Sequence, residues 1–190
     1  MRLILASSSP RRRELLRNAG FEFEVVASEA DETYHRDESP SVNAERIARL
    51  KAETVARRLG TADAVVLAAD TLVVMGDEVL GKPRSPEDAR IMLERLSGRA
   101  HEVISGVALV SPSGNRSLVA HETTRVHFRP LSADEITLYV VTGEPRDKAG
   151  AYAIQGRASR FVTRIEGCYF NVMGLPVALV DTLLRQWRKG

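Results

Sequence analysis

The sequence has little of several features that would assign a protein to a specialised class. Its 190 residues include a single cysteine, Cys168, so an internal disulfide cannot form and a reducing compartment is expected. No apolar run approaches the roughly 20 residues of a membrane span. The amino-terminal residues also lack the apolar core of a signal peptide. We therefore expect a cytoplasmic protein with no membrane partner.

Net charge and aromatic content are low as well. Lys and Arg number 27 against 25 Asp and Glu, and aromatic residues make up 5% of the chain. A nucleic-acid-binding surface is usually strongly basic and often carries aromatic side chains on which bases stack. We therefore expect no nucleic-acid partner. The length and the apolar fraction of 44% suit a globular protein with a substantial core.

Strand-like and helix-like stretches alternate along the first half of the chain. Ser9 is a predicted helix N-cap with Pro10 at the first helical position, and Gly20 closes this helix. Ser85 and Pro86 begin a later helix in the same way. The other predicted helix is 40–59, and the predicted strands are 3–6, 21–26, 64–69, 72–75 and 78–80, the last two joined by a hairpin turn.

The second half predicts longer strands and fewer helices. Ser132 and Glu135 form a capping box at the start of a helix that runs to Val141. The remaining predicted elements are strands 103–110, 118–128 and 161–165, a polar loop at 143–156 and a final helix at 175–188. Together the elements predict a mixed α/β fold in which two lobes surround a sheet that is not purely parallel. We expect residues 1–190 to form one domain.

Three arginines follow the first predicted N-cap. The amino end of a helix carries about half a positive charge, so each cation there costs roughly 0.3–1 kcal/mol in an exposed helix. A bound phosphate would remove that cost, because it pairs with the arginines and the free backbone N–H groups, and the hydroxyls of residues 7–9 add donors. The alternative is a solvated basic turn paired with nearby acids such as Glu14.

Lys51 and Asp70 interrupt apolar patterns. Lys51 lies on the apolar stripe of the helix 40–59, four residues after Ile47 and four before Val55. Its ammonium either reaches the edge of the core or points towards an anion. Asp70 ends the apolar run 64–69, where a carboxylate can bind a metal or act as a base. Asp is also a common turn residue, although the β-favouring residues 71–74 weaken that alternative.

Other charged residues complete an inventory suited to polyphosphate chemistry. Mg²⁺ prefers one or two carboxylates together with substrate phosphates and water, and cations stabilise the phosphate charges. His101, at the start of a strand, is predicted to be structural. The further candidates are Asp31, Glu32, Lys82, Glu144, Asp147, Lys148 and Gln155, each of which can instead be simply solvated.

A series of short motifs runs in order along the chain. They are LASSSPRR at 5–12, DE at 31–32, KA at 51–52, ADT at 69–71, GKP at 81–83, LSG at 96–98, EP at 144–145, DKAGAY at 147–152, IQG at 154–156 and GLP at 174–176. In identity, order and spacing this set resembles the Maf family of nucleoside triphosphate pyrophosphatases. The resemblance extends over nearly the whole chain, which makes it far more specific than any one motif.

The resemblance implies hydrolysis of a nucleoside triphosphate between its α and β phosphates, with a divalent cation, Mg²⁺ or Mn²⁺. It also implies an inosine-triphosphatase-like fold with a central cleft between two lobes, and a homodimer. Asp70 matches the family's catalytic acid, expected to activate water or hold the metal, and Glu32 matches an acid near the metal. Arg12, Lys51 and Lys82 match the cationic groups that hold the triphosphate, and Ser8, in the same turn as Arg12, is a further expected substrate-binding residue.

The resemblance also separates two branches of the family. The branch acting on dTTP and UTP carries Arg after the turn proline, Thr after the catalytic Asp and Gln before the later glycine. Arg11, Thr71 and Gln155 match all three, so a pyrimidine nucleotide is the implied substrate, and the Gln amide can both donate to and accept from a base. Two alternatives remain, a 7-methyl-GTP pyrophosphatase of the same family and a non-catalytic binding protein linked to cell division.

Overall fold

In a computed structural model, which describes residues 1–60 and 63–189, the chain forms a mixed α/β fold. The strands of its seven-stranded sheet are β1 Arg2–Leu5, β2 Glu24–Val25, β3 Ala64–Met75, β4 Glu78–Leu80, β5 Ala100–Val110, β6 Ser117–Phe128 and β7 Val162–Glu166. They are ordered β2-β1-β3-β5-β6-β7, and β4 pairs with β3. Because β1 is parallel to β2 and β3 while β4 and β7 are antiparallel to their neighbours, the predicted mixed sheet is confirmed.

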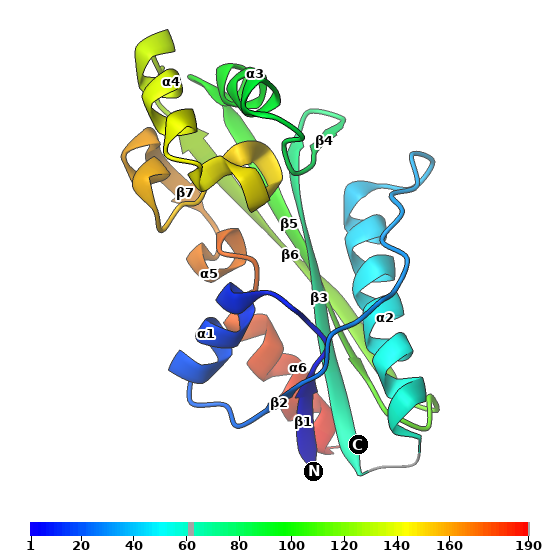
Figure 1. Ribbon diagram of the computed structural model, residues 1–190. Coiled ribbons are helices and arrows are strands. Elements are labelled where there is room, and N and C mark those ends of the chain that lie inside the picture. The colour runs from blue at the N-terminus through cyan, green and yellow to red at the C-terminus, as the bar shows by residue number, and fades with distance from the viewer. Residues whose placement is uncertain (61–62, 190) are drawn as a thin grey trace. The chain divides into compact units, whose positions relative to one another are not determined.

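The sheet is flanked by helices (Figure 1). They are α1 Pro10–Asn18, α2 Pro40–Leu59, α3 Pro86–Leu96, α4 Ala133–Val141, α5 Tyr169–Val172 and α6 Val177–Lys189, with 3₁₀ turns η1 Glu144–Asp147, η2 Ala149–Ala151 and η3 Arg157–Phe161. Serine N-caps begin α1 and α3 as predicted, and Ser132 and Glu135 form the predicted capping box of α4. Within the described residues, no helix combines the length and apolar character needed to cross a bilayer.

The chain divides into two compact units. Unit 1 comprises Met1–Thr71, Ser105–Glu122 and Gly174–Gly190, and unit 2 comprises Leu72–Ile104 and Thr123–Met173. Strands β3, β5 and β6 therefore each contribute residues to both units. The chain crosses from one unit to the other immediately after Thr71 and immediately before Ser105.

Unit 1 buries both faces of its part of the sheet. Val66 and Ala68 of β3 and Ala108 of β5 pack against Ala48 and Ala52 of α2. The residues of opposite parity, such as 65 and 67, are equally buried and point to the other face, where Figure 1 shows α1 and α6. Side chains of consecutive residues in β3 thus meet different helices.

Unit 2 has a core rich in aromatic contacts. His101 packs edge-on against Phe128 and Tyr152, with ring centroids 5.1 and 5.3 Å away, and its Nε2 lies 2.8 Å from the Tyr152 hydroxyl. Only 2% of its surface is exposed, and burial lowers the pKa of His101 to about 4. The structural interpretation of His101 agrees with this environment, since the ring is neutral and enclosed.

The structure corrects several predicted boundaries. β3 does not end at Asp70 but continues to Met75, because the β-favouring residues after Asp70 extend the strand into its hairpin with β4. The predicted strand 21–26 shortens to two residues at the sheet edge, where β1 is its pairing partner. The predicted loop 143–156 contains η1 and η2, and α5 was not predicted.

Candidate active site

The candidate site is built around two consecutive residues of β3. Asp70 has the parity of Ala68 and Val66, so its side chain points towards α2. Thr71 has the opposite parity, and its hydroxyl contacts Arg12 of α1. All the residues that meet at these two positions belong to unit 1. The site therefore has two faces, which we call the Asp70 face and the Thr71 face.

On the Asp70 face, Lys51 joins two carboxylates. Its Nζ lies 2.8 Å from Asp70 Oδ1 and 3.0 Å from Glu32 Oε2, and the residue is 7% exposed. The ammonium thus neither reaches bulk solvent nor lies unpaired in the core. Of the two carboxylates, Asp70 is buried, whereas the Glu32 side chain is 60% exposed.

A glycine in β5 allows α2 to approach the sheet closely enough for this contact. A Cβ atom at Gly106 would lie 2.2 Å from the carbonyl oxygen of Ala44, which is backbone and cannot move aside easily. Ala44 and Ala48 are fully buried on the same helix face as Lys51. Small residues at this packing interface therefore set the depth at which Lys51 lies.

The loop that carries Glu32 is anchored by Asn43, a fully buried residue near the start of α2. Asn43 Oδ1 accepts from the His35 amide at 2.7 Å, and its Nδ2 donates to the His35 carbonyl at 2.7 Å. Arg46 donates to the Thr33 carbonyl at 3.0 Å. The side chain of Asp31 accepts from the amide and hydroxyl of Thr33, so it shapes the loop rather than the ion-pair cluster.

On the Thr71 face, Arg12 turns back from its helix to bind the sheet. Its Nε donates to the Gly174 carbonyl at 2.8 Å, its Nη1 to the Ala69 carbonyl at 2.7 Å and its Nη2 to Thr71 Oγ1 at 3.2 Å. Burial lowers the pKa of Arg12, and the nearby Asp70 carboxylate opposes that shift. The position of Arg12 at this helix start, where a cation is unfavourable, is therefore accounted for by its hydrogen bonds within the protein.

The turn before α1 presents further polar groups. Ser7 is buried and its hydroxyl accepts from the Ser9 amide at 3.1 Å, whereas Ser8 is exposed and Arg11 is half-buried. Ser9 caps the helix by accepting from the Arg12 amide. Ser8 and Arg11 thus lie at a helix amino terminus, next in sequence to residues of the Thr71 face.

The donor set fits a divalent cation. The two carboxylates of the Asp70 face already converge on one positive group, the ammonium of Lys51. Across residues 1–60 and 63–189, no group of three or more His, Cys, Asp or Glu residues is placed to hold an ion. Two carboxylates match the preference of Mg²⁺ for a few protein oxygens completed by phosphate and water.

Lys82 and Gln155 lie in unit 2, and both are exposed. Their segments are connected within that unit, because the amide of Gly150 donates to the carbonyl of Gly81 at 3.1 Å. The backbone beside Gln155 is held by Glu144, which accepts from the Arg157 amide at 3.1 Å.

A glycine allows Glu144 to take that position. A Cβ atom at Gly156 would lie 2.3 Å from the Glu144 carboxylate. The other oxygen of Glu144 accepts from the Tyr139 hydroxyl at 2.9 Å, and desolvation together with this bond raises the pKa of Tyr139. Glu144 therefore holds the backbone at Arg157, two residues after Gln155.

Sequence reasoning missed four residues of the site, which are Asn43, Arg46, Ser105 and Gly174. Ser105 is fully buried, and its Oγ lies 2.8 Å from Thr71 Oγ1. Gly174 belongs to the GLP motif, yet nothing in that motif indicates that its carbonyl accepts from Arg12. A polar residue inside an otherwise apolar strand, as in VISGVALV at 103–110, was the available signal for Ser105.

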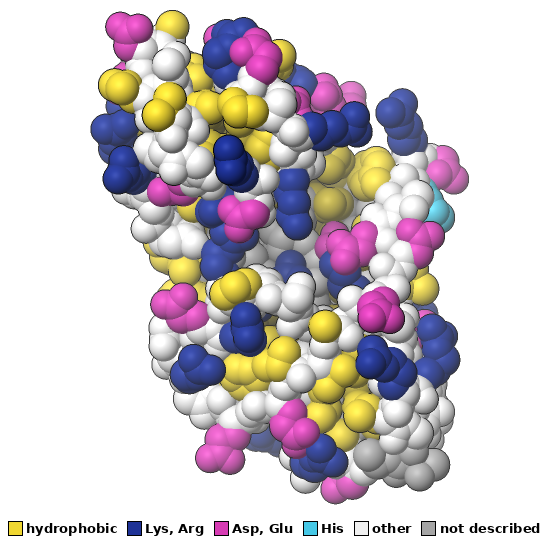
Figure 2. All heavy atoms as spheres, in the orientation of Figure 1, with side chains coloured by type: hydrophobic (Ala, Val, Ile, Leu, Met, Phe, Trp, Pro, Cys, Tyr) yellow, Lys and Arg dark blue, Asp and Glu magenta, His cyan; other side chains and the backbone are white. Residues whose placement is uncertain are grey.

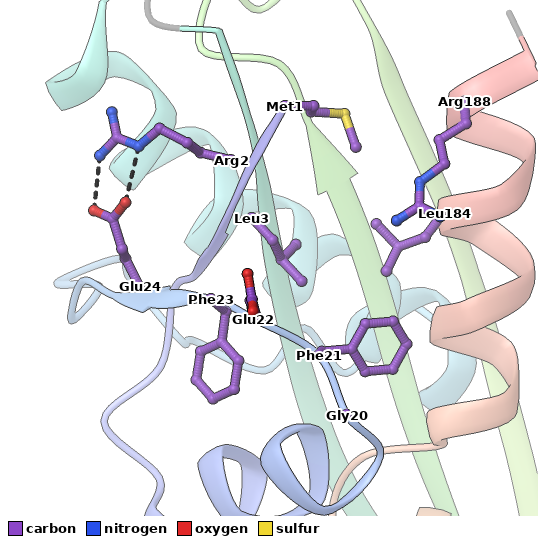
Figure 3. A pocket seen from close by; sticks show the side chains of 10 residues that line it. All are labelled: Met1, Arg2, Leu3, Gly20, Phe21, Glu22, Phe23, Glu24, Leu184 and Arg188. Carbon is purple, nitrogen blue, oxygen red and sulfur yellow. Dashed lines mark hydrogen bonds and ion pairs between the residues drawn. The ribbon is translucent and has the colours of Figure 1, made fainter.

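A separate cavity of about 540 Å³ lies at the amino end of β1, whereas the candidate site lies beyond its carboxyl end. Figure 3 shows Arg2 and Glu24 paired on its rim and the rings of Phe21 and Phe23 beside it. The Arg2–Glu24 bonds of 2.7 and 2.8 Å satisfy these two charges. On the face shown in Figure 2, basic and acidic side chains are interspersed.

Comparison with known proteins gives consistent matches. The family model described as Maf-like protein matches residues 2–187. The chain is 48% identical to a dTTP/UTP pyrophosphatase of Desulforamulus reducens over 97% of this chain and 96% of that protein. It is 53% identical to one of Symbiobacterium thermophilum (97% and 93%) and 52% identical to one of Moorella thermoacetica (96% and 93%).

A solved structure is also similar, at a lower level. It is the nucleoside-triphosphatase, or dITP/XTP pyrophosphatase, of Mycobacterium abscessus, with a TM-score of 0.44 and 19% identity over 69% of this chain and 76% of that chain. A likeness of this degree supports no statement about the site.

Proposed function

Because this chain belongs to the Maf family, we propose that it is a pyrophosphatase that hydrolyses dTTP and UTP to the monophosphate and pyrophosphate. The relatives at about half identity carry that name and are matched over nearly their whole length. Arg11, Thr71 and Gln155, the residues that distinguish this branch, are all present.

The observation that carries the proposal is the Lys51 cluster. An ammonium group bound by two carboxylates lies on one face of β3, and a helix amino terminus with Ser8 and Arg11 follows β1, its parallel neighbour in the sheet. The helix end and the cations suit a polyphosphate, and the carboxylates suit a cation or a water molecule. We assign Asp70 as the catalytic residue, which either takes a proton from water or holds the metal.

We propose that Asp70 and Glu32 would hold a divalent cation, Mg²⁺ or Mn²⁺. When bound, such an ion neutralises phosphate charge and polarises the phosphoanhydride bond. When no metal ion is bound, Lys51 pairs with both carboxylates. Its positive charge then offsets the repulsion between Asp70 and Glu32. The roles of Lys82 and Gln155 as substrate-binding residues remain predictions, as do a homodimer and a cytoplasmic location.

The test is a panel of nucleotides with Mg²⁺ or Mn²⁺, read by the release of pyrophosphate and monophosphate. Preferred turnover of dTTP and UTP, with both products in equal amounts, supports the proposal. Preferred turnover of 7-methyl-GTP assigns the chain to the other branch of the family. If no nucleotide releases pyrophosphate, the alternative of a non-catalytic binding protein holds.

A further inference from the structure

We propose that Tyr139 and Glu144 are positioning residues for Gln155. Together they hold the two ends of the turn that carries Gln155, and so set where its amide is presented to the base of the nucleotide. The proposal rests on the proposed function, in which Gln155 is a substrate-binding residue. Neither Tyr139 nor Glu144 is expected to touch the nucleotide itself.

Gln155 lies at the third position of a four-residue turn. The amide of Gly156 donates to the carbonyl of Ala153 at 3.0 Å, which closes the turn over residues 153–156. Ala153 is buried, whereas Gln155 is exposed. The Gln155 side chain is thus carried by a short backbone segment, and its position depends on how firmly the two ends of that segment are held.

Tyr139 of α4 holds the first end of the turn, and Glu144 of η1 holds the second. The Ala153 amide donates to the Tyr139 hydroxyl at 3.3 Å. The Arg157 amide, directly after the turn, donates to Glu144 Oε2 at 3.1 Å. The Tyr139 hydroxyl also donates to Glu144 Oε1 at 2.9 Å. Consecutive hydrogen bonds therefore link the backbone two residues before Gln155 with the backbone two residues after it.

The direction of each of these bonds is fixed by the chemistry of its members. A backbone amide can only donate and a carboxylate can only accept, so the Tyr139 hydroxyl accepts from Ala153 and donates to Glu144. Desolvation and the bond to Glu144 raise the pKa of Tyr139, so the phenol keeps its proton at neutral pH. The two side chains therefore act as one unit, in which loss of either leaves the other without its partner.

The pair is anchored in the core of unit 2. Tyr139 is fully buried, and its ring packs edge-on against Phe161 with the centroids 5.2 Å apart. The Thr142 hydroxyl donates to the Tyr139 carbonyl at 2.6 Å and accepts from the Glu144 amide at 3.2 Å. The backbones of Tyr139 and Glu144 are thus joined as well as their side chains, and the support extends from the core to the exposed turn.

Gly156 provides the space for this arrangement. Its φ of −100° lies outside the left-handed region, so that angle does not require glycine. A Cβ atom at this position would lie 2.3 Å from Glu144 Oε1 and 2.7 Å from Oε2. An alanine would displace the carboxylate, which is the end of a flexible side chain. Glycine at position 156 is therefore needed for Glu144 to hold the turn.

The experiment compares UTP with CTP, which share the sugar and the triphosphate and differ only along the hydrogen-bonding edge of the base. In Tyr139→Phe and in Glu144→Ala, the ratio of kcat/KM for UTP to kcat/KM for CTP is expected to fall about fivefold, the value of one hydrogen bond. The KM for UTP should carry most of this loss, while kcat stays within twofold. Glu144→Gln, whose amide oxygen can replace one of the two acceptors, should lose less than Glu144→Ala.

A double-mutant cycle tests whether the pair acts through Gln155. Gln155→Ala should lower the UTP to CTP ratio at least as much as Tyr139→Phe. Adding Tyr139→Phe to Gln155→Ala should then change the ratio no further, because the side chain that is positioned has been removed. Gly156→Ala should match Glu144→Ala, and the two combined should be no worse than either alone.

Hydrogen exchange of the Arg157 amide, followed by NMR, gives a measurement without substrate. Tyr139→Phe leaves the acceptor of this amide in place but removes the bond that orients Glu144, so exchange should accelerate about fivefold. The matched control is Tyr152→Phe, which removes another buried phenol of unit 2, one that contacts His101. This control should leave the exchange rate and the UTP to CTP ratio unchanged even where it lowers the melting temperature.

The outcomes separate this inference from the proposed function. An unchanged UTP to CTP ratio in both Tyr139→Phe and Glu144→Ala overturns the positioning role, and so does a further fall when Tyr139→Phe is added to Gln155→Ala. An equal loss of kcat with both nucleotides shows a general structural role and also overturns it. If Tyr139→Phe does not fold, Glu144→Ala and Glu144→Gln decide by the same criteria. A wild-type protein that releases pyrophosphate from no nucleotide ends the proposed function, and the Arg157 exchange rate still decides whether the pair holds the turn.

Discussion

The two faces of β3 at Asp70 and Thr71 differ in the kind of bond that holds them. On the Asp70 face, Lys51 pairs with two carboxylates, one of them on a largely exposed side chain. On the Thr71 face, Arg12 donates to two carbonyls and one hydroxyl, and that hydroxyl also contacts Ser105 and the carbonyl of Gly174. Consecutive residues of one strand thus support an ionic cluster on one side and a fixed hydrogen-bond network on the other.

This difference indicates that the two faces of the site have different roles. The Glu32 side chain is 60% exposed, so its ion pair with Lys51 is weak, and a competing ion or phosphate can replace this partner at little net cost. Hydrogen bonds from a guanidinium to enclosed carbonyls are costly to break, because each carbonyl would lose its partner. The Asp70 face is therefore suited to bind and release ligands, and the Thr71 face is suited to keep Asp70 in place.

The largest effect is expected from Asp70→Asn. The amide is similar in shape and can still accept from Lys51, so the fold should persist, with a melting temperature close to that of the wild type. Turnover of dTTP should fall by about 10²–10⁴-fold, the usual contribution of a proton-transferring group. Pyrophosphate release at saturating dTTP measures it, and Asp31→Asn is the control, because Asp31 only shapes its loop. Undiminished turnover would move catalysis to another residue.

Lys51→Ala should produce the next largest effect. It leaves the carboxylates of Asp70 and Glu32 facing each other without a cation, and removes a positive group from the Asp70 face. We expect kcat/KM for dTTP to fall about 10–100-fold, the range for a hydrogen bond to a charged group. Lys51→Arg, which keeps the charge, should lose less. Equal losses in the two variants would show that packing, and not charge, is what Lys51 supplies.

Asn43→Ala tests whether the Asp70 face depends on the loop that carries Glu32. The side chain of Asn43 holds the backbone at His35 through a pair of bonds of 2.7 Å. Its loss should destabilise the protein by about 1–3 kcal/mol, because buried partners are left without bonds. The Mg²⁺ concentration needed for half-maximal activity should also rise. Urea unfolding and a Mg²⁺ titration measure the two effects, and Asn115→Ala, in an exposed turn, is the control. A normal Mg²⁺ requirement would argue against a metal role for Glu32.

The smallest effect on activity is expected from His101, which lies in the other unit. Its pKa is about 4 when folded and about 6.5 when unfolded, so the unfolded chain binds more protons between these values. Stability is therefore complete above pH 6.5 and decreases as pH falls towards 4, by roughly 3 kcal/mol.

Unfolding free energies measured between pH 4 and 7.5 test this expectation. His101→Phe should flatten the profile in this window and leave turnover at neutral pH nearly unchanged, because the ring is enclosed by Phe128 and Tyr152. A profile that remains equally steep in the variant would assign the pH dependence to other groups.

Local signals predicted the fold well. Serine and proline at helix starts, apolar runs and the Gly76-Asp77 turn indicated the helices and most strands, because capping and periodicity depend on residues a few positions apart. The end of β3 was predicted wrongly, since the pairing of β3 with β4 continues the strand past Asp70. The predicted length of the edge strand β2 was too great for a related reason. Alternation of apolar and polar residues indicates a strand, but backbone pairing with a neighbouring strand decides how long it is.

The site was predicted less completely than the fold. Residue types and family motifs identified Lys51, Asp70 and Glu32, and the structure brings these three together. Thr71 and Arg12 were identified from the same motifs as substrate-binding residues, and this role stays a prediction; the structure shows that Arg12 donates to Thr71 and to the carbonyls of Ala69 and Gly174. Ser105 gave only a faint signal, because a single serine in an apolar strand does not reveal its partner.

The sequence by itself determined the elements, the family and the set of charged groups available for polyphosphate chemistry. Only the tertiary structure decided which of those groups meet, because Lys51 and Asp70 are 19 residues apart, Thr71 and Ser105 are 34 apart, and Arg12 and Gly174 are 162 apart. The direction of each side chain follows from strand parity and helix packing, which bring residues together at the cost of chain entropy. That packing placed Asp70 against the ammonium of Lys51 and Thr71 against the guanidinium of Arg12.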